Sequence, residues 1–117
     1  MEMTERDKSL LTHITQHCEN IFSAINRFGG FSAFTTDTDY FNSVCMSLLQ
    51  IGELANHLSD EFKKNNAEIP WRNIIGLRNV VVHGYGHLDA DTVWATLQED
   101  IPKLSEYCKK ILTACEK

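Results

Sequence analysis

Residues that interrupt regular structure are scarce in this chain, since only 6 of its 117 residues are glycine and 2 are proline. Long helices or strands are therefore expected. No internal repeat, low-complexity tract or linker divides the sequence, and 43% of the residues are hydrophobic. These features predict one globular domain, residues 1–117, with one hydrophobic core.

Positive charge is also scarce, because 11 lysines and arginines stand against 16 aspartates and glutamates, for a net charge of −5. A protein that coats nucleic acid without specificity needs many cation–phosphate contacts, so that function is disfavoured. No apolar run approaches the roughly 20 residues that span a bilayer. The acidic N-terminal residues lack the basic start and apolar stretch of a signal peptide. We expect a cytoplasmic protein without membrane association.

The four cysteines, at positions 18, 45, 108 and 115, form no Cys-x-x-Cys pair. This spacing disfavours a metal or redox site. Each cysteine falls on an apolar stripe of a predicted helix, so we expect four buried thiols, which remain reduced in the cytoplasm.

The histidines outside the central motif give little support for a metal site. His13 and His17 are four residues apart and could share a metal, but only Cys18 is adjacent, so a solvated helix flank is preferred. His57 stands alone and is expected at the surface. We predict neither a metal nor a cofactor.

Three long segments repeat apolar residues at steps of three and four, which is typical of amphipathic helices. The first covers residues 10–28 and is stopped by Gly29-Gly30. The second begins near residues 37–39, where aspartates suit an N-cap, and ends in residues 63–66. The third begins after residue 89 or 91 and contains Pro102, which predicts a kink.

A shorter helix is predicted between the second and third long ones. Pro70 suits its first position, and Gly84 suits its C-terminus. The three valines at 80–82 favour a strand instead, but a single strand would have no partner in this chain, so a helix is preferred. The predicted fold is all-α: an antiparallel bundle of three long helices plus one short, motif-bearing helix.

Residues 69–88 contain Arg72, Arg78, His83 and His87 but no carboxylate. A local cationic site in an acidic chain suggests a focused anion contact, with phosphate as the obvious candidate. Arg78 and His83 are five positions apart, which leaves about 140° between them on an ideal helix. Either Gly84 lets the chain turn and His83 swing back, or two copies of the chain meet across a twofold axis.

This pair suits RNA cleavage by transesterification, which needs two proton transfers and a cation beside the phosphorane. His83 could act as base or acid, and Arg78 could bind the non-bridging oxygens. No carboxylate cluster that would hold Mg²⁺ is evident, so a metal-independent reaction is expected. Asn79 could orient His83 or satisfy nearby backbone, and Tyr85 could be modified, stack on a base or simply pack. A purely structural hydrogen-bond network is the competing interpretation of the pair.

The run Arg78-Asn79-x-x-x-His83-Gly84-Tyr85 resembles the signature of HEPN domains, the "higher eukaryotes and prokaryotes nucleotide-binding" family. In particular it is similar to the HepT toxin branch, whose motif is Arg, four residues, His, one residue and Tyr. Residues 50–55, 70–77 and 101–104 agree with this branch in order, so the resemblance extends from about residue 10 to residue 111. One departure is the apolar run at 80–82, where family members often carry a polar or basic residue.

The resemblance implies a toxin of a toxin–antitoxin pair that acts as a metal-independent endoribonuclease. Arg78 and His83 would be its catalytic residues, in a homodimer whose cleft unites two such pairs, with tRNA or mRNA as substrate. Tyr85 would be the residue that an MntA-type nucleotidyltransferase antitoxin modifies with AMP. Two alternatives remain: a non-catalytic module that binds a nucleotide or a nucleotidyltransferase, and a structural helical dimer.

Overall fold

The computed structural model of the protein describes residues 3–84 and 90–115, with the backbone alone for residues 80–84. Its helices are α1 (Glu5–Phe28), α2 (Phe31–Thr36), α3 (Thr38–Asn56), α4 (Asp60–Asn65), α5 (Trp71–Gly84) and α6 (Ala90–Cys115). No strand occurs in these residues, which confirms the all-α prediction. The three valines at 80–82 lie in α5, so the helix was the right choice there.

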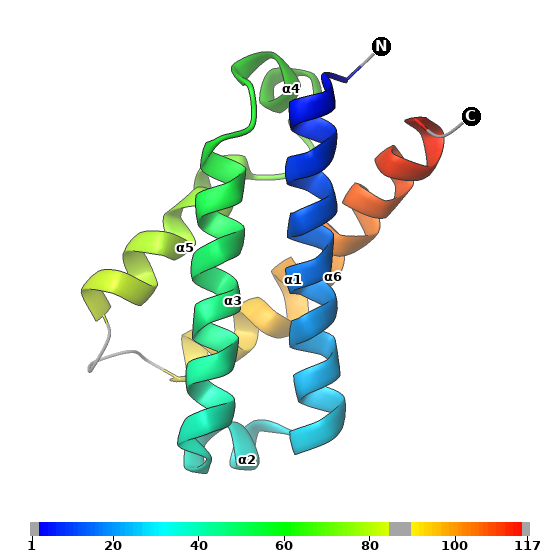
Figure 1. Cartoon of the computed structure of the whole chain (residues 1–117). Helices are drawn as coiled ribbons and strands as arrows, with labels where there is room; N and C mark the ends of the chain where they lie inside the picture. The colour runs from blue at the N-terminus through cyan, green and yellow to red at the C-terminus, as the bar shows by residue number, and fades with distance from the viewer. Residues whose placement is uncertain (1–2, 85–89, 116–117) are drawn as a thin grey trace.

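The three long helices, α1, α3 and α6, have 24, 19 and 26 residues and form the bundle. In Figure 1, α1 and α3 run side by side in opposite directions, and α6 returns across α1. Both termini lie at the same end of the molecule, close to α4. Helix α5 packs on α3 and extends away from the bundle. None of the helices in the described part of the chain is long and apolar enough to cross a membrane.

Helix α1 ends at Phe28 as predicted, but it begins at Glu5, five residues before the predicted start at residue 10. The Thr4 hydroxyl accepts a hydrogen bond from the Asp7 backbone N–H at 3.0 Å and caps the N-terminus. Gly29 has a φ of 108°, a conformation that favours glycine, and follows the last helical residue. Helix α2 was not predicted. It carries the fully buried Phe34 into the core, where its ring packs on Tyr40 and Phe41.

The second predicted long helix, residues 37–66, is wrong as a single element. Helix α3 ends at Asn56, and α4 starts separately after its N-cap Ser59. The Asp7 carboxylate, only 2% exposed, accepts hydrogen bonds from the Ser59 N–H at 2.9 Å and from the Ser59 hydroxyl at 2.6 Å. Ser59 in turn accepts from the Phe62 N–H at 3.1 Å. These hydrogen bonds favour a new helix start at Ser59 over a continuous helix, and they connect the turn between α3 and α4 to α1.

The other boundaries differ little from the prediction. Helix α5 starts at Trp71, and the Pro70 carbonyl accepts bonds from the N–H groups of Asn73 and Ile74, so Pro70 immediately precedes the helix instead of opening it. Pro102 lies inside α6, and the ribbon of that helix bends between its yellow and orange parts in Figure 1.

Three of the four cysteines are buried, as predicted. Burial raises the pKa of Cys18 and Cys108 to about 12 and that of Cys45 to about 11, so these thiols stay protonated. The prediction was wrong for Cys115, which is exposed at the end of α6. The last three residues of that helix, 113–115, are all exposed.

Candidate active site

The predicted anion site lies where α5 crosses α3, and Gly52 permits that crossing. A Cβ atom at residue 52 would lie 3.0 Å from both the backbone N and the Cγ of Arg78, and 3.2 Å from the Ile74 carbonyl O. Only glycine allows two helix backbones to approach this closely. The crossing therefore fixes Arg78 of α5 beside Glu53, the residue that follows Gly52 in α3.

Arg78 and Glu53 form an ion pair across the two helices. The Nη1 atom of Arg78 lies 3.3 Å from Oε2 of Glu53, and the side chains are 30% and 46% exposed. The other oxygen of Glu53, Oε1, lies 3.5 Å from Nε2 of His57, which is 51% exposed. One carboxylate is thus shared by a guanidinium and an imidazole, and all three groups reach solvent.

This arrangement was not predicted. The segment around Arg78 contains no carboxylate, and Glu53, 25 residues earlier in the chain, belongs to another helix. His57 is exposed as predicted, but it does not stand alone. The only sequence signal was the four-residue spacing of Glu53 and His57, which places them one turn apart on a helix.

The remaining predicted residues are only partly described. Asn79 and Arg72 are exposed on α5. His83 belongs to α5 by its backbone, so its position is about 140° around the helix axis from that of Arg78. The His83 side chain lies outside what the structure describes, and so do Tyr85 and His87.

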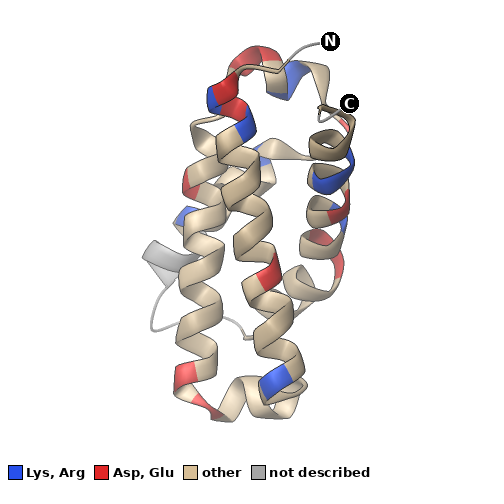
Figure 2. Cartoon of the chain, turned by 45° about the vertical axis from the view of Figure 1, so that its right-hand side comes forward, with Lys and Arg blue, Asp and Glu red and all other residues tan. Residues whose placement is uncertain are grey.

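The surface around this ion pair is poor in charge. Residues 40–52 of α3 contain no lysine, arginine, aspartate or glutamate. Figure 2 shows that charged residues gather at the end of the bundle that bears the termini and along α6. Among the described residues, Arg78 is therefore a local cation on a largely neutral face, with Glu53 as its recorded ion-pair partner.

Among the described residues, no group of three or more His, Cys, Asp and Glu side chains could hold a metal ion. His13 is exposed, and its Nδ1 atom lies 2.8 Å from the Ser9 carbonyl O. The pKa of His17 is lowered, first by burial and then by its proximity to His13.

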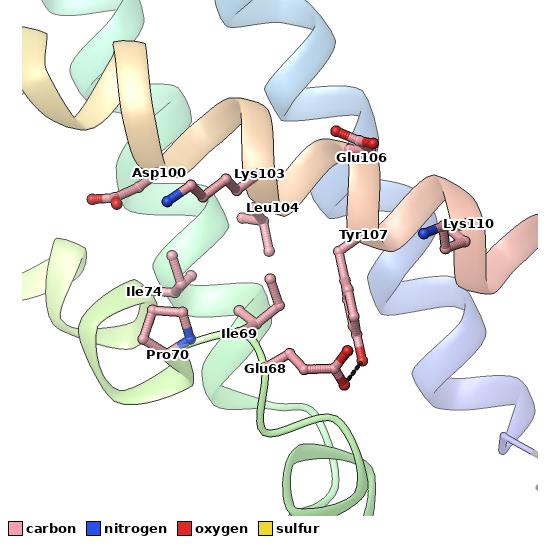
Figure 3. Close-up of a pocket in the computed structure, with 10 residues that line it drawn as sticks. All are labelled: Glu68, Ile69, Pro70, Ile74, Asp100, Lys103, Leu104, Glu106, Tyr107 and Lys110. Carbon is pink, nitrogen blue, oxygen red and sulfur yellow. Dashed lines mark hydrogen bonds between the residues drawn. The ribbon is translucent and has the colours of Figure 1, made fainter.

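A hollow of about 350 Å³ lies away from Arg78, between α6 and the segment that leads into α5. In Figure 3, Ile69, Ile74 and Leu104 point into it, and Tyr107 closes one side. The Tyr107 hydroxyl lies 3.0 Å from Oε1 of Glu68, and burial together with this carboxylate raises the tyrosine's pKa to about 12. The rim carries charges of both signs, so it marks no particular ligand.

An all-α domain that holds an arginine against one exposed carboxylate at a helix crossing is suited to bind an anion in exchange for that carboxylate. The comparison with known families agrees with such a protein. The chain belongs to the ribonuclease HepT-like family, whose model matches residues 14–111. Its enzyme class is therefore that of a ribonuclease, and the resemblance inferred from the motif is confirmed.

Individual relatives agree with the family assignment. A Caldanaerobacter subterraneus subsp. tengcongensis protein named "Putative RNase" is 31% identical over 102 residues, covering 87% of this chain and 90% of the relative. A Thermococcus cleftensis protein named "Probable ribonuclease HepT" is 33% identical over 81 residues, 69% of this chain and 74% of the relative. A Methanocaldococcus jannaschii protein named "Putative RNase" is 30% identical over 82 residues, 62% of this chain and 75% of the relative. No solved structure matches the chain.

Proposed function

We propose that the protein is the toxin of a toxin–antitoxin pair and a metal-independent endoribonuclease that acts through Arg78 and His83. The observation that supports this proposal is the accessible position and the exchangeable ion pair of Arg78. Its guanidinium is accessible, and Gly52 fixes its helix in place. Its ion-pair partner is one half-exposed carboxylate, which an RNA phosphate can replace.

The reaction is attack of a ribose 2′-hydroxyl on the adjacent phosphorus. His83 of one copy accepts the hydroxyl proton, the partner's His83 protonates the leaving 5′-oxygen, and Arg78 stabilises the negative phosphorane through its non-bridging oxygens. The P–O5′ bond breaks, which yields a 2′,3′-cyclic phosphate and a 5′-hydroxyl. Asn79, next to Arg78 on α5, orients the histidine. Each step uses groups that side chains supply, so no metal ion is needed.

The active form is a homodimer. Because α5 stays helical through His83, the helix alone does not bring residues 78 and 83 to one face. A second copy across a twofold axis supplies the missing partner from its own α5. Met46 supports a contact there, because it is 56% exposed and lies two turns before Glu53 on the same face of α3.

The partner that silences the toxin is a nucleotidyltransferase of the MntA type, which transfers AMP to Tyr85. The added phosphate stands seven residues from Arg78 in the chain and competes with RNA for the same guanidinium. Toxin and antitoxin meet in the cytoplasm, where tRNA and mRNA are the available substrates.

The test is incubation of purified protein with tRNA and total RNA, with and without EDTA. Wild-type protein should cleave equally well in both conditions, and Arg78→Ala and His83→Ala should each lose at least about a hundredfold in rate. Arg6→Ala, an exposed arginine of α1 outside the predicted anion site, is the matched control and should stay close to wild type. Activity that EDTA abolishes contradicts the metal-free reaction, and RNA binding without cleavage supports the non-catalytic nucleotide-binding alternative.

A further inference from the structure

His57 is a polar group at the active site that the reaction above does not use. It caps the C-terminus of α3 through its backbone N–H, which lies 3.1 Å from the Leu54 carbonyl O. The imidazole ring takes no part in this cap. It lies near Glu53, with Nε2 of His57 3.5 Å from Oε1 of Glu53. The cap and the ring contact are therefore separable, because a substitution of the side chain leaves the backbone bond intact.

The geometry around Glu53 raises a problem for RNA binding that His57 can solve. Arg78 holds Oε2 of Glu53 at 3.3 Å, so a phosphate must displace this carboxylate to reach the guanidinium. The displaced carboxylate would then face the incoming phosphate without a partner, and two anions at close range repel each other. A donor that already contacts the opposite oxygen of Glu53 can hold the carboxylate aside.

We propose that His57 is a positioning residue for RNA, which takes over Glu53 when Arg78 exchanges that carboxylate for a phosphate. In the free protein Glu53 contacts both groups. In the RNA complex Arg78 contacts the phosphate and His57 alone retains Glu53. The exchange leaves neither the guanidinium nor the carboxylate unpaired. The inference rests on the proposed role of Arg78 and adds a residue from α3 to a site otherwise built on α5.

The role predicts a specific dependence on Glu53. His57→Ala should raise the KM for an RNA oligonucleotide about fivefold, the scale of an exposed ion pair, with kcat and the melting temperature close to wild type. His57→Lys should restore most of the loss, because its ammonium can reach the same carboxylate. In a Glu53→Gln background, His57→Ala should have no further effect, because the charge that it holds aside is gone.

Binding to a labelled 2′-O-methyl RNA oligonucleotide, followed by fluorescence anisotropy, separates this inference from the proposed function. This RNA lacks the attacking hydroxyl and is not cleaved, so affinities are measurable even if wild-type protein has no nuclease activity. The four variants to compare are His57→Ala, His57→Lys, Glu53→Gln and the double variant of Glu53→Gln with His57→Ala. His13→Ala, an exposed histidine of α1, is the matched control.

A fivefold weaker affinity for His57→Ala that disappears in the Glu53→Gln background supports the inference with or without cleavage. An affinity within twofold of wild type overturns it. The same loss in both Glu53 backgrounds also overturns it, because His57 would then act without the carboxylate. If wild-type protein binds no RNA, the inference falls together with the proposed function, whereas binding without cleavage removes only the latter.

Discussion

Gly52→Ala should loosen the α3–α5 crossing, and its cost can be worked from the structure. The new methyl group would lie 3.0 Å from the Arg78 backbone N and 3.2 Å from the Ile74 carbonyl O. Both atoms belong to the backbone of α5, so no side-chain rotation relieves the clash, and the helix must move. Overpacking of this kind lowers the free energy of unfolding by about 1–3 kcal/mol, and the higher helix propensity of alanine raises it by about 1 kcal/mol. The expected net loss is about 1 kcal/mol.

Gly76→Ala provides a matched control in α5 itself. A Cβ at residue 76 meets no atom within 4 Å, so the same substitution gains helix propensity without a clash. It should stabilise the protein by about 1 kcal/mol. At roughly 4 °C per kcal/mol, the melting temperatures of the two variants should differ by about 8 °C.

Thermal unfolding followed by circular dichroism at 222 nm measures this difference, and RNA cleavage measured in parallel tests its consequence for Arg78. Gly52→Ala should lose activity, because a shift of α5 moves the Arg78 guanidinium out of the position that the helix crossing gives it, while Gly76→Ala should keep it. A Gly52→Ala protein as stable as Gly76→Ala would refute the close approach of the two helices.

Further predictions concern the fold. Asp7→Ala leaves the buried N–H of Ser59 without its acceptor, so the free energy of unfolding in urea should fall by about 2 kcal/mol, and an unchanged value would show that the cap is dispensable. Iodoacetamide at about pH 8 should label Cys115 far faster than the three buried cysteines, whose raised pKa values keep them protonated, and equal labelling seen by mass spectrometry would contradict their burial. Because the pKa of His17 is lowered in the folded state, the unfolded chain takes up its proton first, and stability should fall as the pH drops below 6.5. His17→Gln should flatten that fall between about pH 7 and about pH 5 in urea titrations, and an unaltered slope would assign it to other groups.

The fold was largely predictable because its helices carry local signals. The apolar period of α1, the Gly29 stop and the position of Pro70 are short-range features, and each appears in the structure within a few residues of its predicted place. The break between α3 and α4 has a weaker local signal, which is Ser59 followed by Asp60 and Glu61 at the start of α4. Leu58 and Phe62 are both buried and continue the apolar period across the break. The corner depends on Asp7, 52 residues away from Ser59, which a local pattern cannot reveal.

The candidate site was predictable only in part, for the same reason. The motif identified Arg78 from spacing and resemblance, but the carboxylate that faces it belongs to another helix. Gly52, Glu53 and His57 lie within a single stretch of α3, and their relation to Arg78 follows only from the crossing of the two helices. A segment that contains no carboxylate near Arg78 thus becomes part of an ion pair once the chain has folded.

That pairing reconciles an acidic chain with an RNA substrate. A net charge of −5 gives little general attraction for a polyanion, so recognition has to come from a few groups in fixed positions. An arginine without a partner would bind any anion in solution. Arg78 is paired with Glu53, so it would exchange this carboxylate only for an anion that it binds at least as strongly. In the proposed reaction, a phosphodiester that lies beside the Arg78 guanidinium, with its 2′-hydroxyl near His83, would meet both requirements. The same carboxylate that lowers the attraction for RNA therefore raises the selectivity of the site.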